Sequence, residues 1–493
     1  MPEPAPRIVP NSDRSEQELE ALESEVKPLV GAKVEGAGGP ALAATDGERQ
    51  HQCYLCSKGP RSCLLVGAIG LIGVFIANAV LEALEARGAT AQPKIGVPRV
   101  VASPTSERPD PADLPPTTPG KLSLFSADDF RYPYDPSSRA FNVKAMACLR
   151  QTNPDLQHLE YPADAEEHFE KLNQTMTKFT TNVKPLCGKI TAGFCGPWLE
   201  NNWIWQFSDL WKNRRNGTRL RDIFGPYIPI LFPFLDVYVP HFYRYPPGLL
   251  EALNQTMRPN VLYIAVSQSD DGIFGHWPDR KFVKFRQTDF PNMLVLSAGG
   301  YGHVPLPMLK QSEDPVESMP ISDRPYAVSF MGSLDHGPRT CRPHMKLQAE
   351  KWGKLRNKTV KIGFGRDWKE VMTNTALNLS PRGFGRSSYR TGELLQMGLI
   401  PVYIHEEGPW LFYRDLWTKE RIGFSSTVSE LESTLDHAFS DIPKLVDMEK
   451  RIRAMRKTHF LPLGVLDQIY KFMTERDGGG DLRCEPLPAS IIR

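Results

Sequence analysis

Three arginines and a glutamate surround a glycine-rich stretch whose residue types could hold a diphosphate. Over residues 377–404, the pattern of apolar and polar residues predicts a strand, a loop, a helix and a second strand. A helix start leaves backbone N–H groups without intrahelical partners and carries partial positive charge, so a loop that leads into one is a seat for phosphate. Glycines let the backbone come close to a ligand, and a serine can cap the helix. The residues expected at this site are Arg382, Gly383, Gly385, Ser387, Ser388, Arg390 and Glu393, with Arg386 as a lesser candidate.

Two interpretations of these charged residues agree with their spacing. Guanidinium groups near the loop would neutralise a pyrophosphate, and the carboxylate of Glu393 would accept hydrogen bonds from both hydroxyls of a ribose. Alternatively, Arg390 and Glu393 form an ordinary ion pair, three residues apart, on a solvated helix face. Spacing alone does not decide between the two.

The same residues carry a resemblance to a known family. Residues 388–393 (Ser-Tyr-Arg-Thr-Gly-Glu), followed by residues 398–402 (Gly-Leu-Ile-Pro-Val), resemble the donor-site signature of the exostosin-like glycosyltransferases. That family typically shows Ser-x-Arg-x-x-Glu-Ala, a glycine, and then Cys-Ile-Pro-Val. The chain departs from this pattern at Leu394, where alanine is usual, and at Leu399, where cysteine is usual. Both are apolar packing positions.

Two further stretches extend the resemblance, which covers about residues 187–423. Residues 324–333 are similar to the segment that opens the family's donor domain, and residues 295–307 are similar to the passage that joins its two domains. The resemblance implies an α/β fold with two Rossmann-like lobes facing a central cleft, the GT-B type. It also implies that Gly332 and Ser333 belong to the donor site.

The resemblance implies inverting transfer of a sugar from a nucleotide-diphosphate donor to a hydroxyl of an oligosaccharide or polysaccharide acceptor. Carried over position by position, Arg382 and Arg390 bind the diphosphate and Glu393 holds the ribose. The departing diphosphate needs positive charge, from a divalent metal or from fixed dipoles and guanidinium groups. Because no convincing Asp-x-Asp motif precedes the donor site, we expect no obligatory metal and no cofactor besides the nucleotide-sugar substrate.

An inverting transfer also needs a base near the acceptor hydroxyl. Residues 267–277 form a polar loop directly after a predicted strand, and its candidates are Asp270, Asp271 and His276. The alternative is a turn in which the aspartates cap backbone amides. His303, in the passage between the two domains, is another option, with a hydrogen-bonded linker histidine as its alternative.

Two other classes of function share parts of this pattern. A catalytically silent glycan-binding or escort subunit, in a homo- or hetero-oligomer, would lose only the base or a donor contact. A Golgi sulfotransferase would share a membrane anchor and a phosphate loop. It would, however, need a basic phosphosulfate loop soon after the proline-rich stem (84–121) that follows the anchor. Retention of Arg382, Arg390 and Glu393 favours an enzyme that uses a nucleotide sugar.

The composition excludes a broad surface for nucleic acid. The chain has 493 residues, with 59 basic and 57 acidic side chains and a net charge of +2. A nucleic-acid-binding surface would need a concentrated basic excess. The length predicts two or three domains, and a hydrophobic fraction of 41% is ordinary for globular cores.

One segment predicts a membrane anchor. Residues 63–81 carry no charge, and only Asn78 is clearly polar, so as a helix they would span a bilayer. A cleaved signal peptide fits less well because a long segment precedes this stretch, and a buried core helix is the other alternative. The flanking charges are nearly balanced, so they do not set the orientation.

Acceptor sequons for N-glycosylation suggest which part of the chain is lumenal. All of them follow the anchor, and the one at Asn378 is a poor candidate because Pro381 follows it. Together with the resemblance, they predict a type II, single-pass Golgi membrane protein with a lumenal catalytic part. The remaining sequons are at Asn173, Asn216, Asn254 and Asn357.

Composition and periodicity divide the chain into six parts. Alternating strands and helices in the second lobe predict a parallel sheet. In the first lobe, strands are expected over residues 229–239 and 261–266, and the tryptophan-rich residues 197–205 are either lobe core or a sugar-stacking surface. The parts are a disordered cytosolic tail (1–61), a transmembrane signal anchor (62–83), a proline-rich stem (84–121), an acceptor-side lobe (122–306), a nucleotide-sugar-binding lobe (307–425), and C-terminal helices packing back on the first lobe (426–493).

Five of the eight cysteines follow the anchor, in what would be an oxidising compartment. Cys187 and Cys195 would close a small loop and are the expected pair. Cys53 and Cys56 precede the anchor with a zinc-like spacing, but no second ligand pair lies nearby, so acylation or an unmodified thiol is expected there.

Overall fold

The computed structural model describes residues 139–485, apart from 152, 157, 181–198, 239–244, 271, 274–284, 286–288, 311, 339 and 407. The chain divides into two compact units, Met1–Arg108 and Pro109–Arg493, and every described residue belongs to the second unit. The predicted tail, anchor and stem therefore lie outside the described residues. Within the described part, none of the helices combines the length and the apolar character that crossing a bilayer requires.

The first lobe is built on a four-stranded parallel sheet in the order β1-β2-β3-β4. All residues of its two longer strands are buried, as expected when helices cover both faces of a parallel sheet. The strands are β1 (Ile228–Pro229), β2 (Tyr263–Ser267), β3 (Met293–Ser297) and β4 (Val304–Pro305). The helices of this lobe are α3 (Arg139–Arg150), α4 (Ala165–Thr177), α5 (Leu199–Lys212), α6 (Leu220–Phe224), α7 (Phe234–Tyr238) and α8 (Leu249–Thr256).

The strand expected over residues 229–239 was largely wrong. Of the described residues in this range, only Pro229, at the end of β1, is in a strand, and the apolar run continues into α7. A short apolar run fits a buried helix as well as a buried strand, and Pro233, immediately before α7, suits a helix start. Of the tryptophans in 197–205, Trp203 is buried against Phe207 in the lobe core, whereas Trp205 is 45% exposed.

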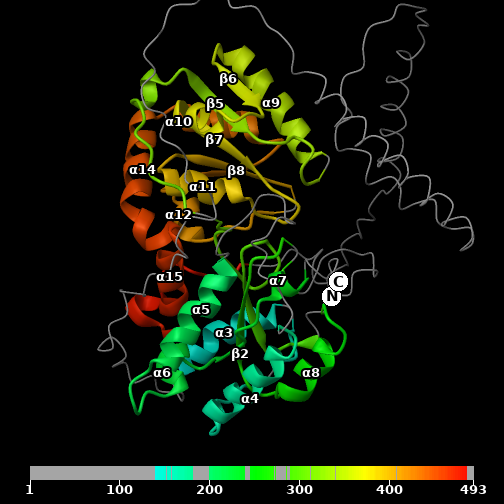
Figure 1. The fold of residues 1–493 in the computed structure, drawn as a ribbon. Helices are drawn as coiled ribbons and strands as arrows, with labels where there is room; N and C mark the ends of the chain where they lie inside the picture. Colours follow the sequence, from blue (N-terminus) through cyan, green and yellow to red (C-terminus); the bar gives the residue numbers. More distant parts are fainter. Residues whose placement is uncertain are drawn as a thin grey trace, which may run out of the picture. The chain divides into compact units, whose positions relative to one another are not determined.

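The second lobe contains a five-stranded parallel sheet in the order β6-β5-β7-β8-β9, with the chain crossing over through helices. The prediction of two α/β lobes with parallel sheets is thus confirmed (Figure 1). The strands are β5 (Tyr326–Met331), β6 (Val360–Gly363), β7 (Thr375–Pro381), β8 (Pro401–His405) and β9 (Phe424–Thr427). The helices are α9 (Cys341–Arg356), α10 (Trp368–Thr373), α11 (Tyr389–Met397), α12 (Arg414–Thr418) and α13 (Leu431–Phe439).

The C-terminal helices contact both lobes. The helix α14 (Ile442–Met455) packs against α11, and α15 (Pro462–Thr474) packs against α5 and α6 of the first lobe (Figure 1). A π-helical turn, η5 (Arg456–Phe460), joins them. A buried ion pair between Arg324 and Glu449 (2.8 Å) fastens α14 to the segment that leads into β5.

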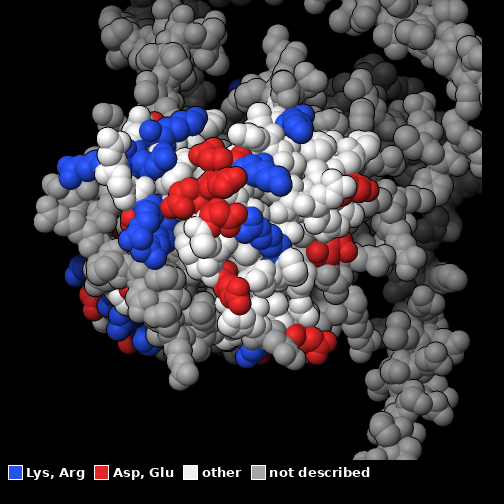
Figure 2. Space-filling view, turned by 90° about the horizontal axis from the view of Figure 1, so that it is seen from below, with Lys and Arg blue, Asp and Glu red and all other residues white. Residues whose placement is uncertain are grey.

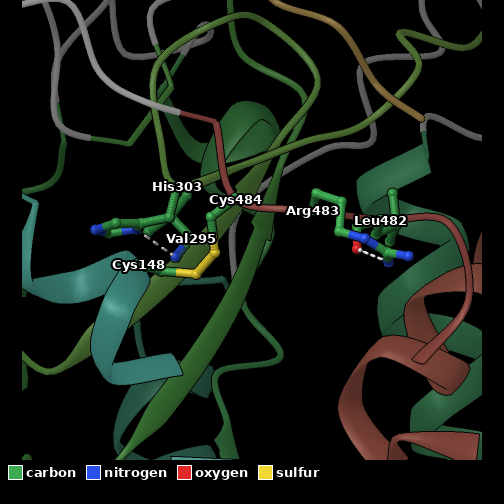
Figure 3. Close-up of a disulfide and its surroundings, with 6 residues drawn as sticks. All are labelled: Cys148, Val295, His303, Leu482, Arg483 and Cys484. Atoms are coloured by element: carbon green, nitrogen blue, oxygen red, sulfur yellow. Dashed lines mark hydrogen bonds between the residues drawn. A yellow bond between two sulfur atoms is a disulfide. The ribbon is translucent and has the colours of Figure 1, made fainter. Parts of the chain in front are cut away.

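One disulfide joins distant parts of the chain. Cys148 of α3 is bonded to Cys484, 336 residues further on (Figure 3). The expected pair, Cys187 and Cys195, lies outside the described residues. Cys341 is a buried free cysteine, and burial raises the pKa of its thiol to about 12.

Charged side chains of both signs share the surface. On the face in Figure 2, acidic side chains gather in the middle and basic side chains surround them. This mixture agrees with the near balance of acids and bases in the composition.

Candidate functional site

The two lobes meet through loops that follow the carboxyl ends of parallel strands. The backbone N–H of Arg386, beyond β7, donates to the carbonyl of Gly299, beyond β3, at 2.9 Å. The hydroxyl of Ser387 donates to the carbonyl of Ala298. The carboxyl edges of the two sheets are therefore in direct contact at the predicted donor loop.

Glycines permit this contact. A Cβ atom on Gly385 would lie within 3.0 Å of the carbonyl oxygens of both Gly299 and Asp270, closer than real Cβ atoms come. The sequence predicted that Gly385 lets the backbone approach a phosphate, whereas the close approach in the structure is to the backbone of the other lobe. Gly383 has more room, because its Cβ would be 3.4 Å from the nearest atom, the carbonyl oxygen of Ser387.

The helix α11 begins and ends where its sequence predicts. The Oγ of Ser388 accepts a hydrogen bond from the N–H of Arg390 at 3.3 Å, which caps the helix start. Gly398 ends the helix in the left-handed conformation, with φ of 82°. The helix packs closely on the inter-lobe passage, since a Cβ on Gly392 would be 2.7 Å from the carbonyl oxygen of Met308.

Arg390 and Glu393 form an ion pair of 2.8 Å, and Glu393 also pairs with Lys310. Arg390 donates to the carbonyl of Met331 at the end of β5, and its guanidinium lies 4.4 Å from the ring centre of Trp368. Burial lowers the pKa of Arg390, and the charge of Glu393 opposes that shift. The three-residue pairing of the alternative is thus present, but the helix face is not solvated, since Glu393 is 5% exposed and lies between two cations.

Lys310 was not anticipated from the sequence. It follows the passage between the lobes, where a single lysine forms no pattern that would single it out.

Arg382 bonds to carbonyls within the loop, whereas Arg386 joins the loop to other segments. Arg382 donates to the carbonyls of Gly385 (3.0 Å) and Phe384 (3.2 Å), and its guanidinium is 3.9 Å from the carboxylate of Glu406. Arg386 is buried and donates to the carbonyls of Gly300 and Pro409. Arg382 and Glu393 therefore contact different partners and do not pair with each other.

Gly332 and Ser333 follow β5 at the same edge of the second sheet. The carbonyl of Ser333 accepts a hydrogen bond from Arg342 at 2.7 Å, and Arg342 also donates to the carbonyl of Arg382 at 3.2 Å. The structure thus brings the loops after β5 and β7 together through Arg342.

Of the three candidate bases in residues 267–277, Asp270 is described, and Asp271 and His276 lie outside the described residues. Asp270 is partly buried at the inter-lobe contact, with its carbonyl oxygen beside Gly385. His303 is buried, and its Nδ1 accepts a hydrogen bond from the N–H of Val295 at 2.9 Å (Figure 3). Burial lowers the pKa of His303 to about 3, so the ring is neutral, as in the linker alternative.

Two buried polar residues at this edge were missed. Glu200 accepts hydrogen bonds from the N–H groups of Leu235 (2.8 Å) and Gln268 (2.9 Å). Burial raises the pKa of Glu200 to about 8, although these hydrogen bonds act against the shift. Gln268 could have been singled out, because it is a polar residue directly after a buried strand.

His405, the last residue of β8, also lies at the carboxyl edge of the second sheet. Burial lowers the pKa of His405 to about 4, and the charges of Arg386 and Arg382 add to this effect. The imidazole is therefore neutral at physiological pH. No motif in the sequence singled out His405.

Two cavities in the described part lie away from these residues. One, of about 680 Å³, is bordered by residues near the amino end of β2, including Glu160, Arg221 and Leu262. Another, of about 410 Å³, lies between α12, β9 and α13. Within the described ranges, no group of three His, Cys, Asp or Glu residues is placed to hold a metal ion.

Comparison with known proteins gives only distant likeness. No protein family matches the chain, and no curated protein matches it. Among solved structures, the GtfA/B complex matches 46% of this chain at 13% identity with a TM-score of 0.29. A TarM variant from S. aureus, in complex with fondaparinux, α-GlcNAc-glycerol and UDP, matches 45% at 10% identity and 0.29. MurG from Acinetobacter baumannii matches 46% of this chain and 69% of its own length at 10% identity and 0.24.

The chain spans about half the length of the first two of these structures, 56% and 54% respectively.

Proposed function

We propose that the chain is an exostosin-like glycosyltransferase of the GT-B type, which moves a sugar from a nucleotide-diphosphate donor to a glycan hydroxyl with inversion. The observation that carries the proposal is the hydrogen bond from Arg386 N to Gly299 O, which joins the carboxyl edges of two parallel sheets. Ligands of open α/β sheets bind outside the carboxyl ends of the strands. A donor on the second lobe and an acceptor on the first would therefore meet at this contact.

The start of α11 and Arg390 are the groups proposed to hold the diphosphate. A capped helix start offers backbone N–H groups and partial positive charge, and the guanidinium adds a full charge beside it. Glu393 is proposed to hold the ribose. Its carboxylate would give up its ion pair with Lys310 or Arg390 and accept hydrogen bonds from the ribose hydroxyls instead. Arg382 would act by keeping the loop in shape, because its side chain donates to a loop carbonyl, and Arg386 would act by joining the loop to Gly300 and Pro409.

In the proposed reaction, the oxygen of the acceptor hydroxyl forms a bond to the anomeric carbon of the donor sugar. The bond from that carbon to the diphosphate breaks, and the nucleoside diphosphate leaves with the electron pair. The hydroxyl proton passes to a base, for which Asp270 is the described candidate. Cationic and dipolar groups at α11 would stabilise the departing charge without an obligatory metal.

The proposed setting is the Golgi lumen, with a single membrane anchor near the N-terminus. The disulfide between Cys148 and Cys484 supports an oxidising compartment for this part of the chain. Asn216, Asn254 and Asn357 are exposed, as glycan acceptors must be.

Incubation of the full chain, purified in detergent, with a panel of UDP- and GDP-sugars tests the proposal. We expect one donor to release nucleoside diphosphate, with no effect of a chelator and with loss of release in Glu393→Ala. Glu317→Gln, at an exposed position of the same lobe, is the control. Absence of release from every donor would reject the proposal, and release of adenosine bisphosphate from a sulfate donor would identify a sulfotransferase.

A catalytically silent glycan-binding subunit is the second candidate. One observation favours it, namely that Arg382, Arg390 and Glu393 already have partners within the protein. Glycan binding without release of any nucleoside diphosphate would identify this function.

A further inference from the structure

A buried glutamine links the first lobe to the beginning of α11. Gln268 follows β2 and is 1% exposed. Its side-chain oxygen accepts a hydrogen bond from the N–H of Leu199 at 2.6 Å. The amide nitrogen is therefore the end that points to the second lobe, where it donates to the carbonyl of Leu309 and lies 3.4 Å from the hydroxyl of Tyr389.

A buried carboxyl group, that of Glu200, holds the backbone of Gln268 in place. Its backbone N–H donates to Glu200 at 2.9 Å, and Glu200 also accepts from Leu235. Because Glu200 lies on α5, the loop after β2 is anchored to the core of the first lobe. Gln268 is thus a rigid contact for α11 and the inter-lobe passage.

Tyr389 is the first residue of α11 and lies between Ser388, which caps the helix, and Arg390. Its hydroxyl reaches the loop that carries Asp270, two residues after Gln268. Burial raises the pKa of Tyr389, and the charge of Asp270 adds to that shift. The backbone of Asp270 also abuts Gly385, so the donor loop touches Asp270 from a second side.

We propose that Tyr389, held by Gln268, is a positioning residue for Asp270, so that the base on the first lobe is set in place only when α11 is docked. The role of Asp270 as a base rests on the proposed function, whereas the contact between Gln268 and Tyr389 does not. Such an arrangement would make transfer depend on the closed arrangement of the lobes.

The decisive variant is Tyr389→Phe, which removes only the hydroxyl. With the donor that the full chain accepts, we expect kcat to fall by about tenfold to a hundredfold, because a displaced reacting group loses that much. The donor KM should stay within about twofold, since Arg390 and Glu393 are unchanged.

The matched control is Tyr326→Phe at the start of β5, on the amino-terminal side of the second sheet, where the loss of a hydroxyl should leave kcat and the donor KM unchanged. Gln268→Met keeps the length of the side chain without its amide. If the two residues act as one contact, Gln268→Met combined with Tyr389→Phe should cost no more kcat than the worse single variant. An equal fall of kcat in Tyr389→Phe and Tyr326→Phe would overturn the proposal. Fully additive losses of kcat in the double variant of Gln268 and Tyr389 would also overturn it.

Backbone hydrogen exchange separates this inference from the proposed function. The peptide that contains Ser269 and Asp270 should exchange faster in Tyr389→Phe than in the unmodified chain or in Tyr326→Phe. That readout needs no donor, so it decides on the contact even if the chain releases no nucleoside diphosphate. Unchanged exchange would show that Tyr389 does not hold the loop and would reject the inference whatever the activity.

Discussion

The N–H of Arg386 and the carbonyl oxygen of Gly299 lie 2.9 Å apart, and this hydrogen bond joins the loop after β7 to the loop after β3. The donor loop is therefore part of the inter-lobe contact as well as the start of α11. A substitution at Gly385 should affect the packing of the lobes before it affects any ligand.

Gly385→Ala should disrupt this contact, whereas Gly383→Ala should not. A Cβ on Gly385 would collide with the backbone of Gly299 and Asp270, but on Gly383 it would find ordinary contact distance. We expect Gly385→Ala to lower the free energy of unfolding by about 1–3 kcal/mol, as overpacked sites do. Urea unfolding midpoints of the two variants measure the difference. Equal midpoints would show that the lobes do not meet at Gly385.

Glu393→Gln should destabilise the protein even without a donor. Glu393 is 5% exposed and lies between Lys310 and Arg390, so its loss leaves two cations side by side. We expect a loss of roughly 2–4 kcal/mol in the free energy of unfolding. Thermal unfolding checks this, with the exposed Glu317→Gln as the control. A Glu393→Gln protein as stable as the control would mean that the two ion pairs contribute nothing to the fold.

His303 should contribute to acid sensitivity. Burial lowers its pKa in the folded protein to about 3, below the ordinary value of 6.5. Its contribution to stability is therefore fully present above pH 6.5 and is lost as the pH falls toward 3. His303→Asn, whose side-chain oxygen can still accept from Val295, should flatten the fall in unfolding midpoint between about pH 6.5 and pH 4. His158→Asn, at a side chain that is 73% exposed, should keep the slope of the unmodified chain, and equal slopes in both variants would refute the prediction.

Removal of the disulfide should be costly. Cys148 and Cys484 are 336 residues apart, so the bond closes a very long loop of the unfolded chain. Cys484→Ala should lower the free energy of unfolding by about 2–5 kcal/mol. Calorimetry with and without a reducing agent measures the effect, and a reducing agent should have little influence on the variant. Cys341→Ala, which removes a buried free thiol, should retain the response to reducing agent.

Glycosylation should follow exposure. Asn216, Asn254 and Asn357 are exposed, whereas Asn378 is fully buried in β7 and bonds to Ser329. After expression through a eukaryotic secretory pathway, peptide mass spectrometry should find glycans at the three exposed asparagines and none at Asn378. Unmodified asparagines at all three positions would contradict the proposed lumenal location of this part of the chain.

Local patterns were enough to predict much of the second lobe. The cap at Ser388, the left-handed Gly398 and the apolar strands on either side of α11 all depend on residues near one another in the sequence. Hydrogen bonding and side-chain periodicity act over a few residues, so their sequence signals are direct. Where the local signal was ambiguous, in residues 229–239, the prediction was wrong because a buried helix and a buried strand are equally apolar.

The sequence by itself therefore determined the parallel sheet of the second lobe, the position of the glycine-rich loop and the resemblance at Ser388 to Glu393, from which the two-lobed arrangement was inferred. Only the tertiary structure decided which partners these residues meet. Glu393 with Lys310, Gln268 with Tyr389 and Cys148 with Cys484 are pairs far apart in the chain. Such contacts depend on how separate parts of the chain pack together. The hydrophobic pattern within either lobe does not predict that packing.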